Sequence, residues 1–147
     1  MDKGVYCLVL ANESCRIPVG ALGTIGFSRG WHVYTGSALG PGGLLRVSRH
    51  FRLSSTWIGK KRWHIDYLLT DPGFSLRYAV CARTTGPLEC VLAEAVGGKP
   101  VPHFGCSDCH CRSHLFYFDT DPLERVIDCF DSVGLAPGIA TINTVER

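Results

Sequence analysis

The chain has 147 residues, which is enough for one domain with a hydrophobic core and too few for two. Its 46% hydrophobic and 19% charged residues are typical of a globular domain, and no apolar run is long enough to cross a bilayer. The apolar stretch at residues 5–11 is too short for the hydrophobic part of a secretion signal. We therefore expect a cytoplasmic protein with no membrane partner.

The net charge of +2 hides an uneven distribution along the chain. Residues 1–64 carry nine Lys and Arg against Asp2 and Glu13, a net +7, whereas residues 65–147 carry six against eleven acids, a net −5. One acid-free stretch holds six cations: Arg46, Arg49, Arg52, Lys60, Lys61 and Arg62. This stretch predicts either a surface facing nucleic-acid phosphates or the solvated face of a helix and its loop, and charge alone favours the second.

The first third of the chain predicts strands joined by turns. Residues 4–10 are apolar and β-prone, which indicates a strand. Residues 11–30 are rich in glycine and predict turns with short strands around Ile17 and Ile25. A second long strand is predicted to begin at Trp31 and to continue through the tyrosine motif that follows.

A helix is predicted at residues 43–53, after a glycine-rich breaker. Its apolar stripe consists of Leu44, Val47 and Phe51. Arg46 and His50 are four residues apart and therefore share a face. We expect that face to point away from the core, with Arg49 beside it.

The remaining elements are shorter. Three further helices are predicted at residues 60–70, 86–97 and 121–133, and two strands at 76–82 and 115–118. In the second of these helices we expect an apolar stripe of Leu88, Val91, Leu92 and Ala95. The chain from residue 134 onward is expected to be loose.

These elements predict an α+β fold. A small, mainly antiparallel sheet from residues 4–36 and 74–82 is flanked by the helices near residues 43–53, 86–97 and 121–133. We expect one domain over residues 1–147. Its core spans about residues 4–105, with a Cys/His-rich turn at 103–114 and an acidic helix at 121–133 appended.

Two tyrosine motifs and one helix carry the most specific signal. Gly4-Val5-Tyr6 and Tyr34-Thr35-Gly36 place one phenol on each strand of a predicted hairpin, and Arg46 and His50 follow on a helix. Two phenols, a guanidinium and an imidazole at one place suit phosphodiester chemistry.

In this order the residues resemble the GIY-YIG nuclease superfamily. The family's acidic residue, on a later helix ahead of an apolar pair, corresponds to Glu89, and the resemblance spans about residues 4–105. Residues 33–40, 63–69 and 107–115 resemble more closely a small branch of that superfamily whose members are domains of unknown function.

The resemblance implies metal-assisted hydrolysis of a nucleic-acid backbone. Glu89 would hold one Mg²⁺ or Mn²⁺, and Arg46 would bind the phosphate oxygens as negative charge builds. Tyr6 would act as, or orient, the general base, and Tyr34 and His50 would complete the proton path. DNA is the expected partner, with RNA left open.

Each of these residues also has a structural interpretation. Tyr6 and Tyr34 can be sheet-packing residues with exposed hydroxyls, and Glu89 can simply favour the dipole of its helix. Two positions depart from the family pattern. Ser37 stands where many members have lysine, and residues 13–142 lack the asparagine often found after the acidic helix.

A cluster of thiols and imidazoles follows the third helix. Cys106, Cys109, Cys111 and His114 could bind zinc, although a tight turn explains the same spacing. A further alternative is that His110 or His114 lines the same site as Glu89. Other cysteines lie in or beside apolar segments, where we expect free thiols that act as small hydrophobic groups: Cys7, Cys15, Cys81 and Cys90.

Three functions follow from these patterns. The first is a metal-dependent endonuclease that acts on DNA. The second is a non-catalytic nucleic-acid-binding module of the same fold, and the third is a zinc-stabilised structural or interaction domain. In the first two, cations outside the catalytic set contact phosphates: Arg49, Arg52, Lys60, Lys61 and Arg62. The sequence leaves the oligomeric state open.

Overall fold

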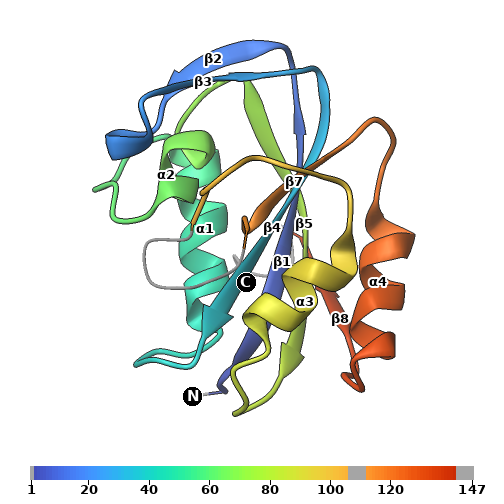
Figure 1. The fold of residues 1–147 in the computed structure, drawn as a ribbon. Helices are drawn as coiled ribbons and strands as arrows, with labels where there is room; N and C mark the ends of the chain where they lie inside the picture. Colours follow the sequence, from blue (N-terminus) through green and yellow to red (C-terminus); the bar gives the residue numbers. More distant parts are fainter. Residues whose placement is uncertain (1, 106–111, 142–147) are drawn as a thin grey trace.

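The computed structural model describes residues 2–105 and 112–141. Within these residues, a six-stranded antiparallel sheet in the order β6-β7-β4-β1-β5-β8 lies between two layers of helices (Figure 1). The strands of this sheet are β1 (Gly4–Asn12), β4 (Gly30–Ala38), β5 (Phe74–Arg83), β6 (Lys99–Pro100), β7 (Leu115–Phe118) and β8 (Gly138–Ala140). The α+β fold expected from the sequence is confirmed.

The helices and a small separate ribbon complete the fold. The α-helices are α1 (Leu45–Thr56), α2 (His64–Leu69), α3 (Glu89–Val96) and α4 (Leu123–Ser132). A two-stranded ribbon with a short 3₁₀ helix between its strands consists of β2 (Cys15–Pro18), η1 (Gly20–Leu22) and β3 (Thr24–Phe27). None of the helices among the described residues combines the length and apolar character that crossing a bilayer requires.

The pairing of β1 with β4 places the two motif tyrosines on one face of the sheet. Tyr6 lies opposite Gly36, and Leu8 lies opposite Tyr34. Residues directly opposite one another in an antiparallel pair project from the same face, and so do alternate residues along a strand. Both phenols therefore project from the face that α1 and α2 cover.

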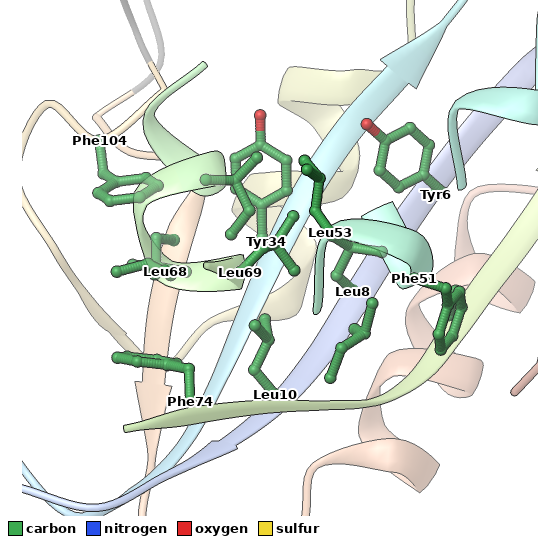
Figure 2. Close-up of a cluster of buried hydrophobic side chains, with 14 of the residues drawn as sticks. Tyr6, Leu8, Leu10, Tyr34, Phe51, Leu53, Leu68, Leu69, Phe74 and Phe104 are labelled. Atoms are coloured by element: carbon green, nitrogen blue, oxygen red, sulfur yellow. The ribbon is translucent and has the colours of Figure 1, made fainter. Parts of the chain in front are cut away.

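The sheet separates two hydrophobic cores of different composition. The core under α1 and α2 is rich in aromatic and branched side chains and is shown in Figure 2; its buried members include Tyr6, Leu8, Leu10, Tyr34, Phe51, Leu53, Leu68, Leu69, Phe74 and Phe104. The core under α3 and α4 consists mainly of aliphatic side chains and cysteines; its buried members include Val5, Cys7, Val9, Val33, Val80, Leu92, Val96, Val126, Cys129 and Phe130.

Most expected elements are present, and three details differ. Residues from 134 onward are not all loose, because β8 pairs with the edge of β5. The segments expected as appendages belong to the fold itself: β7 pairs with β4, and α4 packs into the second core. The predicted stripe of α3 is wrong, because Leu92, Ala93 and Val96 face the core while Val91 is 51% exposed.

Candidate functional site

Five of the predicted site residues come from four elements that are far apart in the chain. Tyr6 lies on β1, Tyr34 on β4, Arg46 and His50 on α1, and Glu89 is the first residue of α3. Figure 2 shows the hydroxyls of Tyr6 and Tyr34 pointing to the same end of the aromatic core, away from Leu8 and Leu10. The structure brings this set together at that end of the sheet.

Tyr6 and His50 form a buried hydrogen-bonded pair. The Tyr6 hydroxyl lies 2.8 Å from His50 Nε2, and neither side chain is more than 2% exposed. The phenol has room only because its partner on β4 is Gly36, where a Cβ atom would overlap the Tyr6 ring. The expectation that His50 points away from the core is wrong, since this imidazole is completely buried between α1 and the sheet.

The buried pair is electrically neutral. Burial lowers the pKa of His50 from 6.5 to about 3, so the ring carries no charge at neutral pH. Burial also raises the pKa of Tyr6 well above 10, and the neighbouring Tyr34 raises it further. The proton therefore stays on the phenol, and the pair acts as a directional hydrogen-bonding unit rather than as a ready phenolate base.

The backbone of Ser37 connects Arg46 with Glu89. Pairing of β7 with β4 ends at Tyr34, so the last residues of β4 extend beyond that neighbour. Arg46 Nη1 donates a 2.6 Å hydrogen bond to the Ser37 carbonyl, and a hydrogen bond from the Ser37 backbone lowers the pKa of Glu89. At this edge, a cation from the helix on one face meets an acid from the helix on the other.

The phase of α3 turns Glu89 inward. Glu89 precedes Leu92, Ala93 and Val96 by three, four and seven residues, so it stands at the first turn of the buried stripe. Burial raises its pKa from 4.5 to about 7, opposed by the charge of Arg46 and the Ser37 bond. The carboxylate nevertheless remains 26% exposed, which leaves it within reach of solvent or a ligand.

His114 is the neighbour of Glu89 that the sequence motifs did not assign. Its Nδ1 lies 3.1 Å from Glu89 Oε1, and its ring is 2% exposed. The alternative in which His114 lines the same site as Glu89 is therefore the arrangement the structure has. Burial lowers the pKa of His114, opposed by a hydrogen bond to the Thr35 backbone. The histidine orients the carboxylate without neutralising it by charge.

The donor set around Glu89 fits a cation that keeps most of its water. Among residues 2–105 and 112–141, no group of three or more His, Cys, Asp or Glu side chains could enclose a metal ion. Mg²⁺ is commonly bound through one or two carboxylates, with water and substrate phosphate filling the other positions. One partly exposed carboxylate beside a phosphate-binding arginine matches that pattern.

Trp63 supports both arginines of α1, a role that the sequence patterns did not indicate. The guanidinium carbons of Arg46 and Arg49 lie 4.7 and 4.8 Å from the centroid of the indole ring. Arg49 also forms two 3.1 Å hydrogen bonds to the buried carboxylate of Asp66. Arg49, expected to contact phosphate, is thus committed to internal contacts and holds the base of the site.

The other expected phosphate-binding cations are on the surface. Arg52, Lys60, Lys61 and Arg62 are all exposed, and Lys61 Nζ lies 5.7 Å from the centre of the Tyr67 ring. These side chains lie at the end of α1 and in the segment that follows it. They form a basic surface next to the site rather than part of its buried framework.

The cysteines divide into two groups. Cys7, Cys15, Cys81 and Cys129 are free thiols, as expected for the first three. The same expectation for Cys90 is wrong, because Cys90 is disulfide-bonded; its sulfur lies 3.8 Å from His114 Nε2. Cys106, Cys109 and Cys111 lie outside the described residues, so the zinc site that they would form with His114 stays a prediction.

These features define a class: a small α+β domain with a phenol–imidazole pair, an arginine and a desolvated carboxylate at one sheet edge. The chain belongs to the family described as "Domain of unknown function DUF123", whose family model matches residues 5–135. No curated protein and no solved structure matches the chain. The family covers all five of these site residues except none of its role assignments, which rest on the geometry above.

Proposed function

We propose that the protein is a metal-dependent endonuclease of the GIY-YIG type that hydrolyses phosphodiester bonds in DNA, in the cytoplasm. The observation that supports it best is the meeting of Arg46 and Glu89 at the Ser37 backbone, beside the Tyr6–His50 pair. Packing alone does not require an arginine and a carboxylate from opposite layers to approach one another at a sheet edge. Phosphodiester hydrolysis requires both, one for the phosphate and one for the cation.

Glu89 would hold one Mg²⁺ or Mn²⁺, with His114 orienting the carboxylate through the 3.1 Å contact. When bound, such a cation polarises the phosphate and stabilises the leaving oxygen. The raised pKa of Glu89, about 7, means that the carboxylate binds a cation better as the pH rises through that value. The metal requirement and the pH dependence thus arise from the same desolvated group.

Arg46 binds the non-bridging oxygens of the scissile phosphate in this proposal. The Ser37 carbonyl and the Trp63 ring already hold its guanidinium, so little orientation is lost when substrate arrives. The side chain is partly exposed and keeps further N–H groups for the phosphate. A preoriented donor of this kind favours the more negatively charged transition state over the ground state.

Tyr6, Tyr34 and His50 orient the attacking water and the phosphate. The Tyr6 phenol keeps its proton, so we assign it an orienting role with His50 as its partner rather than a role as a phenolate. Tyr34 is 8% exposed and points to the same end of the core. Its hydroxyl would contact the phosphate or the water.

A cleavage assay with a matched control tests the proposal. Labelled nicked, branched and single-stranded DNA, with RNA in parallel, is incubated in Mn²⁺ at pH 8 with wild type, Glu89→Gln and Glu94→Gln. Glu94 lies on the same helix but is exposed, so its variant should cut like the wild type. Glu89→Gln should bind DNA without cutting it.

The same assay separates the nuclease from its alternative. A non-catalytic binding module would show salt-dependent affinity in all three proteins and no product in any of them. Cutting that persists in Glu89→Gln, or that proceeds equally well in EDTA, would contradict the assignment of Glu89. The exposed cations Lys60, Lys61 and Arg62 favour DNA binding in either case.

A further inference from the structure

The loop between α1 and α2, residues 57–63, presents two large apolar side chains to solvent. Trp57 is 54% exposed and Ile58 is 79% exposed. Lys60, Lys61 and Arg62 follow immediately and are exposed as well. A tryptophan and an isoleucine held in water next to three consecutive cations contribute nothing to the core, so their exposure calls for a partner.

The backbone of this loop is held in place. Trp57 adopts a left-handed conformation with φ 59°, which is uncommon for a bulky residue, and its N–H donates to the Leu53 carbonyl at 2.9 Å. The Thr56 hydroxyl donates to the Arg52 carbonyl at 2.9 Å and accepts the N–H of Ile58 at 3.2 Å. The two apolar side chains are therefore displayed by a built turn.

The far end of the loop is tied to the candidate site. Arg49 Nη2 donates a 3.1 Å hydrogen bond to the Lys60 carbonyl, and the Trp63 ring lies against both Arg46 and Arg49. The buried Asp66 carboxylate accepts the backbone N–H groups of Arg62 and Trp63 at 2.8 and 3.1 Å. The apolar pair is thus positioned relative to the arginine that we assign to the phosphate.

Charge decides which partner fits this surface. The nearest acid along the chain is Asp66, whose side chain is 0% exposed and already bound to Arg49, so the loop presents only positive charge to solvent. An anionic partner with flat apolar surfaces between its charges meets both requirements. Nucleic acid has this structure, with stacked bases between phosphates, and exposed aromatic and aliphatic side chains can insert at a base step.

We propose that residues 57–62 act as a wedge that recognises DNA at a discontinuity. Trp57 and Ile58 occupy an unstacked base step, while Lys60, Lys61 and Arg62 hold the flanking phosphates. Opening an intact step costs unstacking free energy, whereas at a nick or a junction much of that stacking is already lost. The preferred ligand is therefore nicked or branched DNA rather than an intact duplex. This inference rests on the proposed function, whose substrate it narrows.

The test measures base unstacking without cleavage. DNA with 2-aminopurine beside a nick, and the matching intact duplex, are titrated in EDTA with Glu89→Gln protein, alone or combined with Trp57→Ala/Ile58→Ser. The control variant combines Glu89→Gln with Ile139→Ser, which removes an apolar side chain that is 50% exposed on β8. Binding to nicked DNA should raise 2-aminopurine fluorescence in the parent and in the control.

The wedge variant should lose that rise in fluorescence. Its affinity for nicked DNA should fall about 10-fold, within the range of one stacked base, and its affinity for intact duplex by less than about 2-fold. Lys60→Gln/Lys61→Gln should instead weaken binding to both DNAs and reduce the slope of log K against log salt by about 2. Circular dichroism of each variant verifies folding.

Two outcomes would overturn the wedge. One is a wedge variant that still prefers nicked DNA; the other is tight binding of the parent to phosphatidylserine vesicles with no 2-aminopurine response, which would assign the loop to a lipid surface. A wild type that never cuts DNA, but whose fluorescence response depends on Trp57 and Ile58, would refute hydrolysis and leave the wedge in place. The two proposals therefore fail separately.

Discussion

The two faces of the central sheet solve the same packing problem with different materials. Under α3 and α4, the core consists mainly of valine, leucine and cysteine side chains. Under α1 and α2, the core also buries polar groups: the Tyr6–His50 pair, His32 bonded to Asn12 at 2.8 Å, and Asp66 bonded to Arg49. Buried polar groups restrict geometry because each must satisfy specific partners, whereas aliphatic contacts tolerate exchange.

The difference indicates a division of labour. The aliphatic face contributes stability and carries Glu89 only because the first turn of α3 reaches the edge of β4. The polar face positions Arg46, His50 and both tyrosines. If this division is correct, substitutions on the polar face should alter activity more than stability, and those on the aliphatic face should do the reverse.

The largest effect is expected at Glu89. Glu89→Gln should lower the rate of DNA cleavage by about 10³-fold or more, because the site then lacks its anionic cation ligand. Stability should change in the opposite direction. A carboxyl whose pKa rises from 4.5 in the unfolded chain to about 7 in the fold loses stability as pH rises between those values.

In EDTA at pH 8, Glu89→Gln should therefore be more stable than the wild type, by about 1–3 kcal/mol. Urea unfolding at pH 8 and at pH 4.5 measures this difference, which should vanish at the lower pH. A variant that is less stable at pH 8 would show that the carboxylate is held by favourable bonds rather than strained by burial.

The aliphatic face is tested by two neighbouring residues of α3. Leu92 is fully buried and Val91 is 51% exposed. Leu92→Ala should reduce the free energy of unfolding by about 2–5 kcal/mol, and Val91→Ala by less than about 0.5 kcal/mol. Cleavage per folded molecule should stay within about 2-fold for both. Equal losses in the two variants would mean that the helix faces the core with a different stripe.

Gly36 lies where the two properties meet. A Cβ atom at Gly36 would overlap the Tyr6 ring, whereas one at Gly26 in β3 has open space around it. Gly36→Ala should cost about 1–3 kcal/mol of stability and displace the phenol from His50, so cleavage should fall as well. Gly26→Ala is the matched control, and urea unfolding with a cleavage assay measures both. Full activity in Gly36→Ala would remove Tyr6 from the mechanism.

The smallest effect is an acid sensitivity specific to the polar face. Burial lowers the pKa of His50 to about 3 and that of His32 to about 4, from 6.5. Between those values the unfolded chain binds the extra protons, so stability falls as pH decreases below 6.5. Each histidine should cost about 1 kcal/mol at pH 5.5 relative to pH 7.5.

Comparing wild type with His50→Gln isolates the contribution of His50, because the opposing contribution of Glu89 is present in both proteins. The gap in unfolding free energy between the two should narrow as pH falls from 7.5 to 5.5. A gap that widens on acidification would mean that His50 is protonated in the fold.

Local patterns along the chain predicted the elements well and their orientation less well. The strands around Tyr6 and Tyr34 follow from continuous β-prone residues, and α1 follows from the spacing of Val47 and Phe51. The stripe of α3 could not be predicted reliably, because Val91, Leu92, Ala93, Ala95 and Val96 are all apolar and surround most of the helix. Only contact with β4 selected the buried side.

His50 shows a second limit of the same kind. Histidine next to three arginines on one helix suggests an exposed polar face, and Arg52 does lie on one. His50 is buried because the Tyr6 hydroxyl on another strand satisfies its Nε2. A hydrogen bond between residues 44 positions apart has no local signature.

The sequence by itself determined the α+β class, the two tyrosine strands and the Arg46–His50 spacing, because these depend on period-2 and period-3.6 patterns that act over a few residues. The tertiary structure alone decided which side chains are buried, that Arg49 binds Asp66, and that Arg46 and Glu89 meet at Ser37. Those arrangements depend on where β7 stops pairing with β4 and on how α3 is rotated. Such contacts join distant segments, so their free energy exists only once the chain has folded.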